Sequence, residues 1–242
     1  MNNDSTDLGP IDFSEVQIPA EETQLRQDDL DICLKGLPAT VFEVLKESKC
    51  CVAGGYIRDT VAQIEIPKDI DIFTDSELSA RMIATRLLYG AAYCRVNGRN
   101  KRIVETGKAL SVVGAYKGPT PQVIFKWVFE DMSKVIDAFD FTCCQAAFWW
   151  DGAKFVSRCA PTFYSDTESE RLVYTSPKGN DPVGSVLRLL KLYRRGFDID
   201  QNNLALVLAS LCGEIEGAGN LVGTGIFESI HSRIPERFNG KY

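Results

Sequence analysis

Two stretches decide the fold of this chain: VAGGYIRD at residues 52–59 and DIDIFT at residues 69–74. The apolar residues before Gly54 predict a buried strand, and the residues after Gly55 predict a short helix. Alternate side chains of a strand share a face, so Asp69 and Asp71 are expected to point the same way while the isoleucines enter the core. The pattern therefore predicts a strand, a glycine turn, a helix and a second strand that displays two carboxylates.

The two carboxylates indicate a cation site. Like charges on one face repel each other unless a cation lies between them. Oxygen donors without a nearby histidine favour Mg²⁺ or Mn²⁺ over zinc. Gly54 and Gly55 allow a close backbone approach at a helix N-terminus, which suits a triphosphate, and Arg58 is one turn into that helix. We expect Asp69 and Asp71 to bind metal and the glycines and Arg58 to bind phosphates.

A third acid is needed to complete such a metal site. Asp140 lies between two aromatic residues in a run that reads as a strand, VIDAFDF, and it is the preferred candidate. Asp137 is the competitor, but three residues from Asp140 it is expected to face the other way.

Composition excludes several other chemistries. The 242 residues contain one histidine, His231, which leaves no room for histidine triads or histidine-ligated zinc. The eight cysteines form no C-x-x-C pair, and we expect reduced thiols in a core. No apolar run approaches the roughly 20 residues of a membrane span. The polar, acidic start is unlike a signal peptide, so a cytoplasmic location is expected.

The chain divides into three expected parts. Residues 1–35 read as an acidic flexible leader, because residues 1–31 carry nine acids and one arginine. Residues 36–160 read as one domain with helices placed early and strands from 91 to 157, an α+β pattern with a mixed, mainly antiparallel sheet flanked by helices. Residues 161–242 read as a linker and helices. Basic clusters at 95–126 and 188–195 are candidate phosphate contacts, with solvated surface as the alternative.

These motifs resemble the polymerase-beta-like nucleotidyltransferase superfamily. VAGGYIRD followed by DIDIFT resembles the head domain of CCA-adding tRNA nucleotidyltransferases and bacterial poly(A) polymerases. Asp140-Phe141-Thr142 is similar to the Asp-Phe-Thr segment of that family, and Asp181-Pro182 with Arg188 is loosely similar to its neck helix. The three motifs occur in the family order and cover about residues 50 to 200.

The resemblance implies a nucleotidyltransferase head followed by a short, truncated helical neck. It implies that Asp69, Asp71 and Asp140 are catalytic metal ligands, and that Gly54, Gly55, Arg58 and Arg188 bind the nucleotide. Asp59 matches the motif too, and a salt-bridged acid is the alternative for it. The expected reaction transfers a nucleoside monophosphate from a nucleoside triphosphate, ATP among them, to an RNA 3′ end, such as that of tRNA.

Some positions depart from the family pattern. Ala138 and Phe139 stand where the family has two arginines, and no Glu-Asp-x-x-Arg segment follows residue 195. The sequence therefore supports the chemistry better than the substrate. A protein or small-molecule acceptor is the alternative, and a catalytically inactive module that binds nucleotide or RNA is a third.

Overall fold

The computed structural model describes residues 23–63, 66–90, 100–175 and 181–217. The helices are α1 (Gln27–Lys35), α2 (Ala39–Glu47), α3 (Gly55–Ala62), α4 (Glu77–Gly90), α5 (Phe163–Glu168), α6 (Pro182–Tyr193) and α7 (Gln201–Gly217), with the 3-10 turns η1 (Met132–Ala138) and η2 (Thr142–Cys144). The strands are β1 (Cys50–Ala53), β2 (Asp69–Thr74), β3 (Arg102–Glu105), β4 (Ala109–Val113), β5 (Thr120–Val128), β6 (Ala146–Trp150) and β7 (Phe155–Cys159).

The strands form one seven-stranded sheet in the order β3-β4-β5-β2-β1-β6-β7. The central pair β2 and β5 is parallel, and the pairs on either side are antiparallel. This architecture confirms the predicted α+β class with a mixed, mainly antiparallel sheet.

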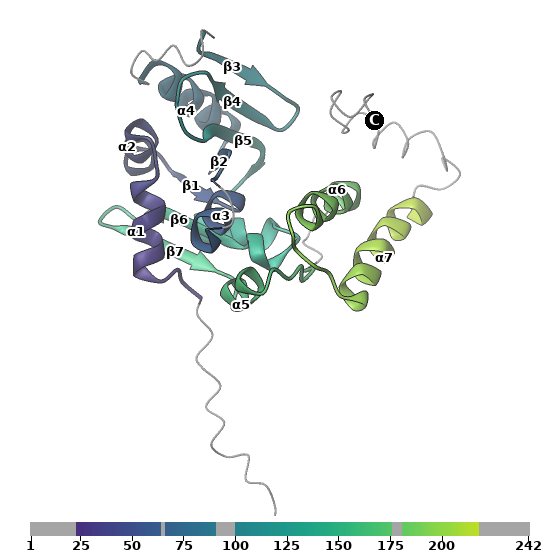
Figure 1. The fold of residues 1–242 in the computed structure, drawn as a ribbon. Coiled ribbons are helices and arrows are strands. Elements are labelled where there is room, and N and C mark those ends of the chain that lie inside the picture. Colours follow the sequence, from purple (N-terminus) through teal and green to yellow (C-terminus); the bar gives the residue numbers. More distant parts are fainter. Residues whose placement is uncertain (1–22, 64–65, 91–99, 176–180, 218–242) are drawn as a thin grey trace, which may run out of the picture.

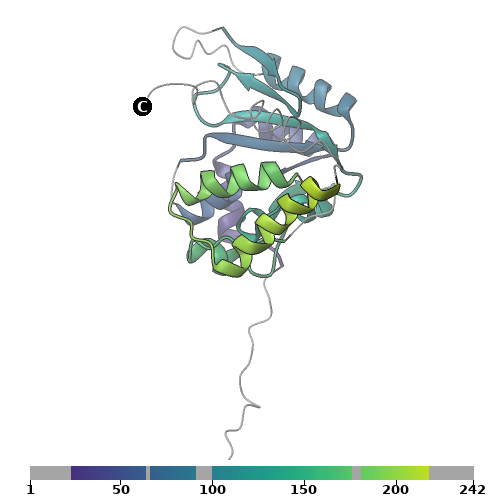
Figure 2. The ribbon, with the colours of Figure 1, turned by 90° about the vertical axis from the view of Figure 1, so that its right-hand side faces the viewer.

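The two faces of the sheet are covered differently. Ile70 and Ile72 of β2 are fully buried with side chains of α1 to α4, whereas Phe73 packs with residues of η1 on the opposite face. A third apolar cluster joins η2 to α6 and α7, which lie on the far side of the molecule from α1 and α2 (Figure 1). Figure 2 shows α6 and α7 as a layer in front of the strands. The second face is therefore where α6 approaches the sheet.

Local sequence explains the elements around β2. In α4, Ala80, Ile83, Ala84 and Leu87 are buried at the spacing of one helix face. Ser76 caps this helix, since its Oγ accepts a hydrogen bond of 3.1 Å from the Ser79 N–H. The predicted strands at β1 and β2 and the predicted helices at α3, α4 and α6 are confirmed.

The structure differs from the sequence-based expectations at two places. Gln27–Lys35 is a helix with Leu30 and Cys33 buried, so the acidic leader predicted for residues 1–35 is wrong for this part, because apolar spacing outweighs acidic composition. The run VIDAFDF is not a strand but the end of the 3-10 turn η1 followed by an extended link that leads to η2. The strand expected at residues 91–96 lies outside the described residues.

The described residues also bear on the expectations for the cysteines and for membrane-spanning helices. Six cysteines are free and buried, as predicted: Cys33, Cys50, Cys51, Cys143, Cys144 and Cys159. No helix among the described residues is both long and apolar enough to cross a membrane.

Candidate active site

A small polar cavity of about 100 Å³ lies where α3, β2 and α6 meet. Its lining residues are Gly55, Tyr56, Arg58, Asp59, Lys68, Asp69, Asp71, Lys191 and Arg195. A larger cavity of about 520 Å³ between α1 and α3 is lined mostly by apolar groups and contains neither carboxylate of β2. The small cavity is therefore the candidate active site.

Sheet register places the glycine turn beside the two carboxylates. β1 is antiparallel to β2, with Val52 opposite Ile72. The end of β1, where α3 begins, thus lies level with the start of β2. This arrangement brings Gly55 and the first turn of α3 to Asp69 and Asp71, as the sequence predicted.

The carboxylates of Asp69 and Asp71 interact as like charges. Burial, and then the negative charge of Asp69, raise the pKa of Asp71 from 3.8 to about 6, while the Lys191 ammonium opposes the rise. A carboxyl group whose charged form is disfavoured gains from a nearby cation. The pair therefore has the electrostatics of a cation-binding site.

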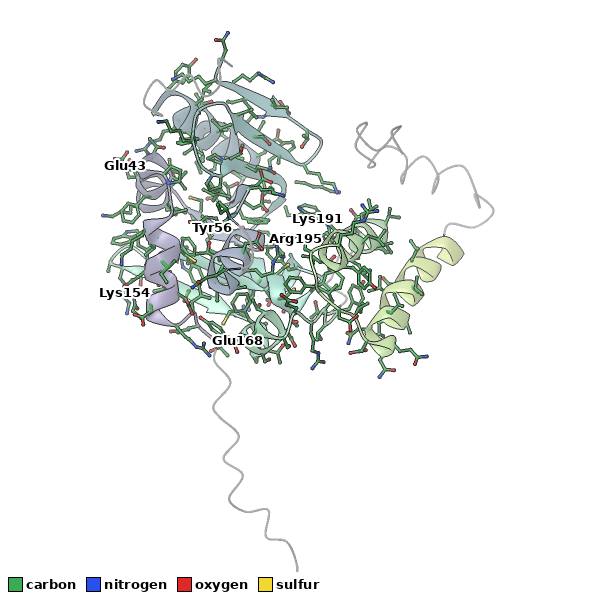
Figure 3. All side chains as sticks on the ribbon, in the orientation of Figure 1. Glu43, Tyr56, Lys154, Glu168, Lys191 and Arg195 are labelled. Atoms are coloured by element: carbon green, nitrogen blue, oxygen red, sulfur yellow. The ribbon has the colours of Figure 1, made fainter. Side chains whose placement is uncertain are left out.

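The wall of the cavity opposite the two carboxylates carries the cations Lys191 and Arg195. Lys191 of α6 and Arg195, in the turn after it, lie on the side that faces α3 and Tyr56 (Figure 3), and Lys68 precedes β2. Lys191 lies in the last turn of α6, and Arg195 lies in the turn that follows the C-cap Arg194. The cavity thus places positive groups opposite two carboxylates, which suits phosphate groups bound together with a cation.

Arg58 is an organising residue at the base of the cavity. Its Nε and Nη2 donate to Asp59 Oδ1 at 2.8 and 2.6 Å, and its Nη1 donates to Cys144 Sγ at 3.0 Å. Asp59 also forms an ion pair of 3.0 Å with Arg195. These contacts tie α3 to η2 and to the turn after α6, and they confirm the salt-bridged interpretation of Asp59. Direct phosphate binding by Arg58 stays a prediction.

Gly54 shapes the start of α3. Its φ of +81° is strained for any residue with a side chain, and an added Cβ would lie 2.6 Å from Cε1 of Phe139. An added Cβ on Gly55 would meet nothing closer than Arg58 Nη2 at 3.5 Å. Gly54 is therefore required by the turn, whereas Gly55 is the glycine exposed to the cavity.

Asp140 does not line the cavity. Its side chain is 3% exposed and its Oδ2 accepts a hydrogen bond of 2.6 Å from Arg188 Nε. Asp137, the competitor, lies 3.4 Å from Arg158 in an ion pair. The roles of Asp140 as third ligand and of Arg188 in nucleotide binding stay predictions, and the structure shows the two joined to each other.

The donor set at β2 fits one divalent cation. Mg²⁺ in proteins is commonly held by one or two carboxylates, with substrate phosphates and water completing its coordination. Within residues 23–63, 66–90, 100–175 and 181–217, no group of three or more His, Cys, Asp or Glu side chains could hold a metal ion. Asp69 and Asp71 therefore suit a cation that arrives with the nucleotide.

Sequence reasoning missed some residues around the site. Gln122 of β5 is the register partner of Asp71 in the parallel pair, so both side chains are on the same face of the sheet. Only strand pairing reveals this neighbour. Lys191 and Arg195 belong to the basic cluster at 188–195, but only the tertiary structure shows that these two line the cavity.

The raised pKa of Asp71 predicts a pH dependence. A proton and a cation compete for this carboxylate, so we expect Mg²⁺ affinity to fall as pH decreases through about 6. Without divalent cation, the folded chain binds more protons than the unfolded chain between pH 3.8 and about 6. Stability should therefore decrease as pH rises through that window.

Calorimetric titration of Mg²⁺ and thermal unfolding at several pH values would measure both effects. Asp71→Asn removes the disfavoured charge and should stabilise the metal-free protein at pH 7 by on the order of 1 kcal/mol. Asp137→Asn, on an exposed acid, is the matched control. An Asp71→Asn protein that is less stable than the parent at pH 7 would contradict the assignment.

The fold is similar to that of part of the CCA-adding enzymes. The Thermotoga maritima CCA-adding enzyme complexed with tRNA matches with a TM-score of 0.51 at 16% identity, over 74% of this chain and 43% of that one. A CCA-adding enzyme complexed with CTP matches at 0.50 and 16%, over 74% and 43%. One complexed with ATP matches at 0.50 and 17%, over 76% and 44%. This chain thus spans less than half the length of these enzymes.

The chain belongs to the Gabija anti-defense 2 family, Gad2, whose sequence model matches residues 24–170. The matched region contains α3, β2 and the whole sheet. No curated protein matches the chain in sequence.

Proposed function

We propose that this protein transfers a nucleoside monophosphate from a nucleoside triphosphate to an acceptor hydroxyl. One observation carries the proposal: two like-charged carboxylates, a glycine turn at a helix N-terminus and the cations Lys191 and Arg195 line a single cavity. A triphosphate with its divalent cation satisfies all three, because it supplies negative charge to the cations and positive charge to the carboxylates.

The proposed reaction is a displacement at the α-phosphorus. The acceptor oxygen forms a bond to phosphorus while the bond to the oxygen that bridges to the β-phosphate breaks. Pyrophosphate leaves with that electron pair, and the hydroxyl proton passes to water. A bound Mg²⁺ would stabilise the charge that develops on the phosphate oxygens.

The chain's own residues position the reactants. Asp69 and Asp71 would hold the cation, and the N-terminus of α3 at Gly55 would receive the phosphates. Lys191 and Arg195 would neutralise the triphosphate and pyrophosphate. Asp59, held by Arg58, pairs with Arg195 in the turn after α6 and so fixes the distance between the two walls of the cavity.

Two acceptor classes follow from different observations. An RNA 3′ end, such as that of tRNA, is the first candidate, supported by the fold shared with CCA-adding enzymes and by five Lys and Arg against one acid in residues 100–128. A component of the Gabija defence is the second, supported by the family description. In either case, we propose that nucleotidyl transfer is the chemistry behind the anti-defence role.

Label transfer tests the function and identifies the acceptor. The protein is incubated with Mg²⁺ and each of the four α-labelled nucleotides, with total RNA in one series and purified Gabija proteins in another. We expect label in one acceptor class and stoichiometric release of pyrophosphate. Nucleotide binding by calorimetry without any transfer would instead assign the chain as an inactive nucleotide-binding module.

A further inference from the structure

The sheet order determines from which side an acceptor reaches the nucleotide. β2 lies between β1 and β5, and the phosphate-binding turn at Gly54 and Gly55 follows β1. In phosphoryl-type displacement, the attacking and leaving oxygens are roughly in line on opposite sides of phosphorus. The proposed function puts the pyrophosphate at the glycine turn, on the β1 side, and an in-line acceptor hydroxyl would then approach from the β5 side.

Gln122 is the residue that meets an acceptor from that side. It pairs in register with Asp71 on a strand about 4.8 Å away. Next to it, Ser111 of β4 pairs with Gln122, so the same face continues as a polar, partly exposed surface. A neutral amide oxygen at this position can accept a hydrogen bond from a hydroxyl without adding a third negative charge.

The face of β5 that carries Gln122 also carries Trp127, nearer the end of the strand, with two lysines close to its ring. Phe125 packs with the core below the sheet, whereas Ile124 and Trp127 pack on the face that Gln122 shares. The Nζ atoms of Lys126 and Lys108 lie 5.0 and 5.5 Å from the ring centroid of Trp127. Trp127 is roughly 15 Å from Gln122 along the strand, a span of a few nucleotides.

An aromatic ring with lysines at its side is the chemistry that recognises unpaired bases and their phosphates. We propose that the acceptor is the 3′ end of a single-stranded nucleic acid lying along β5, with an unpaired base on Trp127 and the terminal hydroxyl held by the Gln122 amide. The proposal rests on the proposed function and adds the acceptor's route to it. On binding, a base takes the place of the exposed Lys126 ammonium over the ring, and the ammonium moves to a phosphate.

Binding of a 5′-labelled unstructured oligoribonucleotide with a free 3′-hydroxyl tests the route, with fluorescence anisotropy as the readout. Trp127→Leu should weaken binding roughly 10-fold, whereas Trp127→Phe retains a stacking plane and most of the affinity. Lys126→Gln should reduce the slope of binding against salt by about one. Lys154→Gln makes the same charge change on the β6–β7 turn at the opposite edge of the sheet and should leave the slope unchanged. The unfolding free energy of each variant is measured, because Trp127 also packs in the core.

Steady-state transfer to the same oligonucleotide tests Gln122. Gln122→Ala should raise the KM for the acceptor about 10-fold and leave the KM for the nucleotide unchanged. Gln122→Asn retains a neutral amide oxygen that accepts a hydrogen bond and should restore part of the acceptor KM. A purely structural role would move both KM values or neither.

The outcomes separate this inference from the proposed function. Transfer to a protein with no dependence on Trp127, Lys126 or Gln122 would overturn the inference and leave the proposed function standing. Failure to bind any nucleotide with Mg²⁺ would overturn both. An acceptor KM unchanged in Gln122→Ala would overturn the assignment of that residue.

Discussion

Asp69→Asn and Asp71→Asn are each expected to reduce nucleotidyl transfer by roughly 10²- to 10³-fold. Loss of a cation's charge stabilisation is worth several kcal/mol, and about 1.36 kcal/mol corresponds to a factor of ten in rate. Each substitution retains the shape of the side chain and removes one negative charge that faces the cavity. The rate of label transfer from an α-labelled nucleotide to the identified acceptor measures the effect.

Substitution of two further acids, Asp137 and Asp140, shows whether the loss of rate is specific to Asp69 and Asp71. Asp137→Asn removes an exposed acid in an ion pair with Arg158 and should leave the rate unchanged. Asp140→Asn should lower stability, because the carboxylate accepts a hydrogen bond from Arg188, and its Mg²⁺ affinity tests the predicted role of Asp140 as third ligand. A loss of Mg²⁺ affinity in Asp140→Asn would establish Asp140 as a metal ligand. A rate near that of the parent in Asp71→Asn would overturn the site.

Gly54→Ala should destabilise the fold by about 3 kcal/mol or more, the largest stability effect we expect. A positive φ costs a residue with a side chain roughly 1–3 kcal/mol, and overpacking adds a similar amount. The new methyl group would meet the Phe139 ring at 2.6 Å. Urea unfolding measures the change, with the slope of the transition as a check on two-state behaviour.

Two other glycines separate the two causes of this destabilisation, the positive φ and the contact with Phe139. Gly152 has φ +105° and open space around the site of a Cβ, so Gly152→Ala should cost only the conformational strain, about 1 kcal/mol. Gly55→Ala has neither problem and should leave stability close to that of the parent while narrowing the cavity. Equal stability of Gly54→Ala and the parent would show that Phe139 moves aside.

Strong local patterns predicted the central elements correctly. The apolar run before Gly54, the alternation of β2 and the spacing of α4 are each determined by neighbours in sequence, so the prediction did not need the tertiary fold. The prediction of a flexible leader was wrong for Gln27–Lys35, because Leu30 and Cys33 are buried against α3, which is distant in sequence. The prediction of a strand around Asp140 was wrong for a similar reason. Alternating apolar residues predict a strand, but Val135 and Ile136 pack on the sheet from a 3-10 turn.

The sequence by itself determined which residues carry the chemistry of β2 and the turn before α3, because a strand's alternation and a glycine's freedom are properties of a few adjacent residues. Only the tertiary structure decided what faces them. Lys191 of α6 and Arg195 of the following turn line the cavity, and Gln122 of β5 pairs in register with Asp71, all more than 50 residues along the chain from Asp71. Asp140 is instead held by Arg188, since pairing between distant charges depends on how helices pack and not on spacing along the chain.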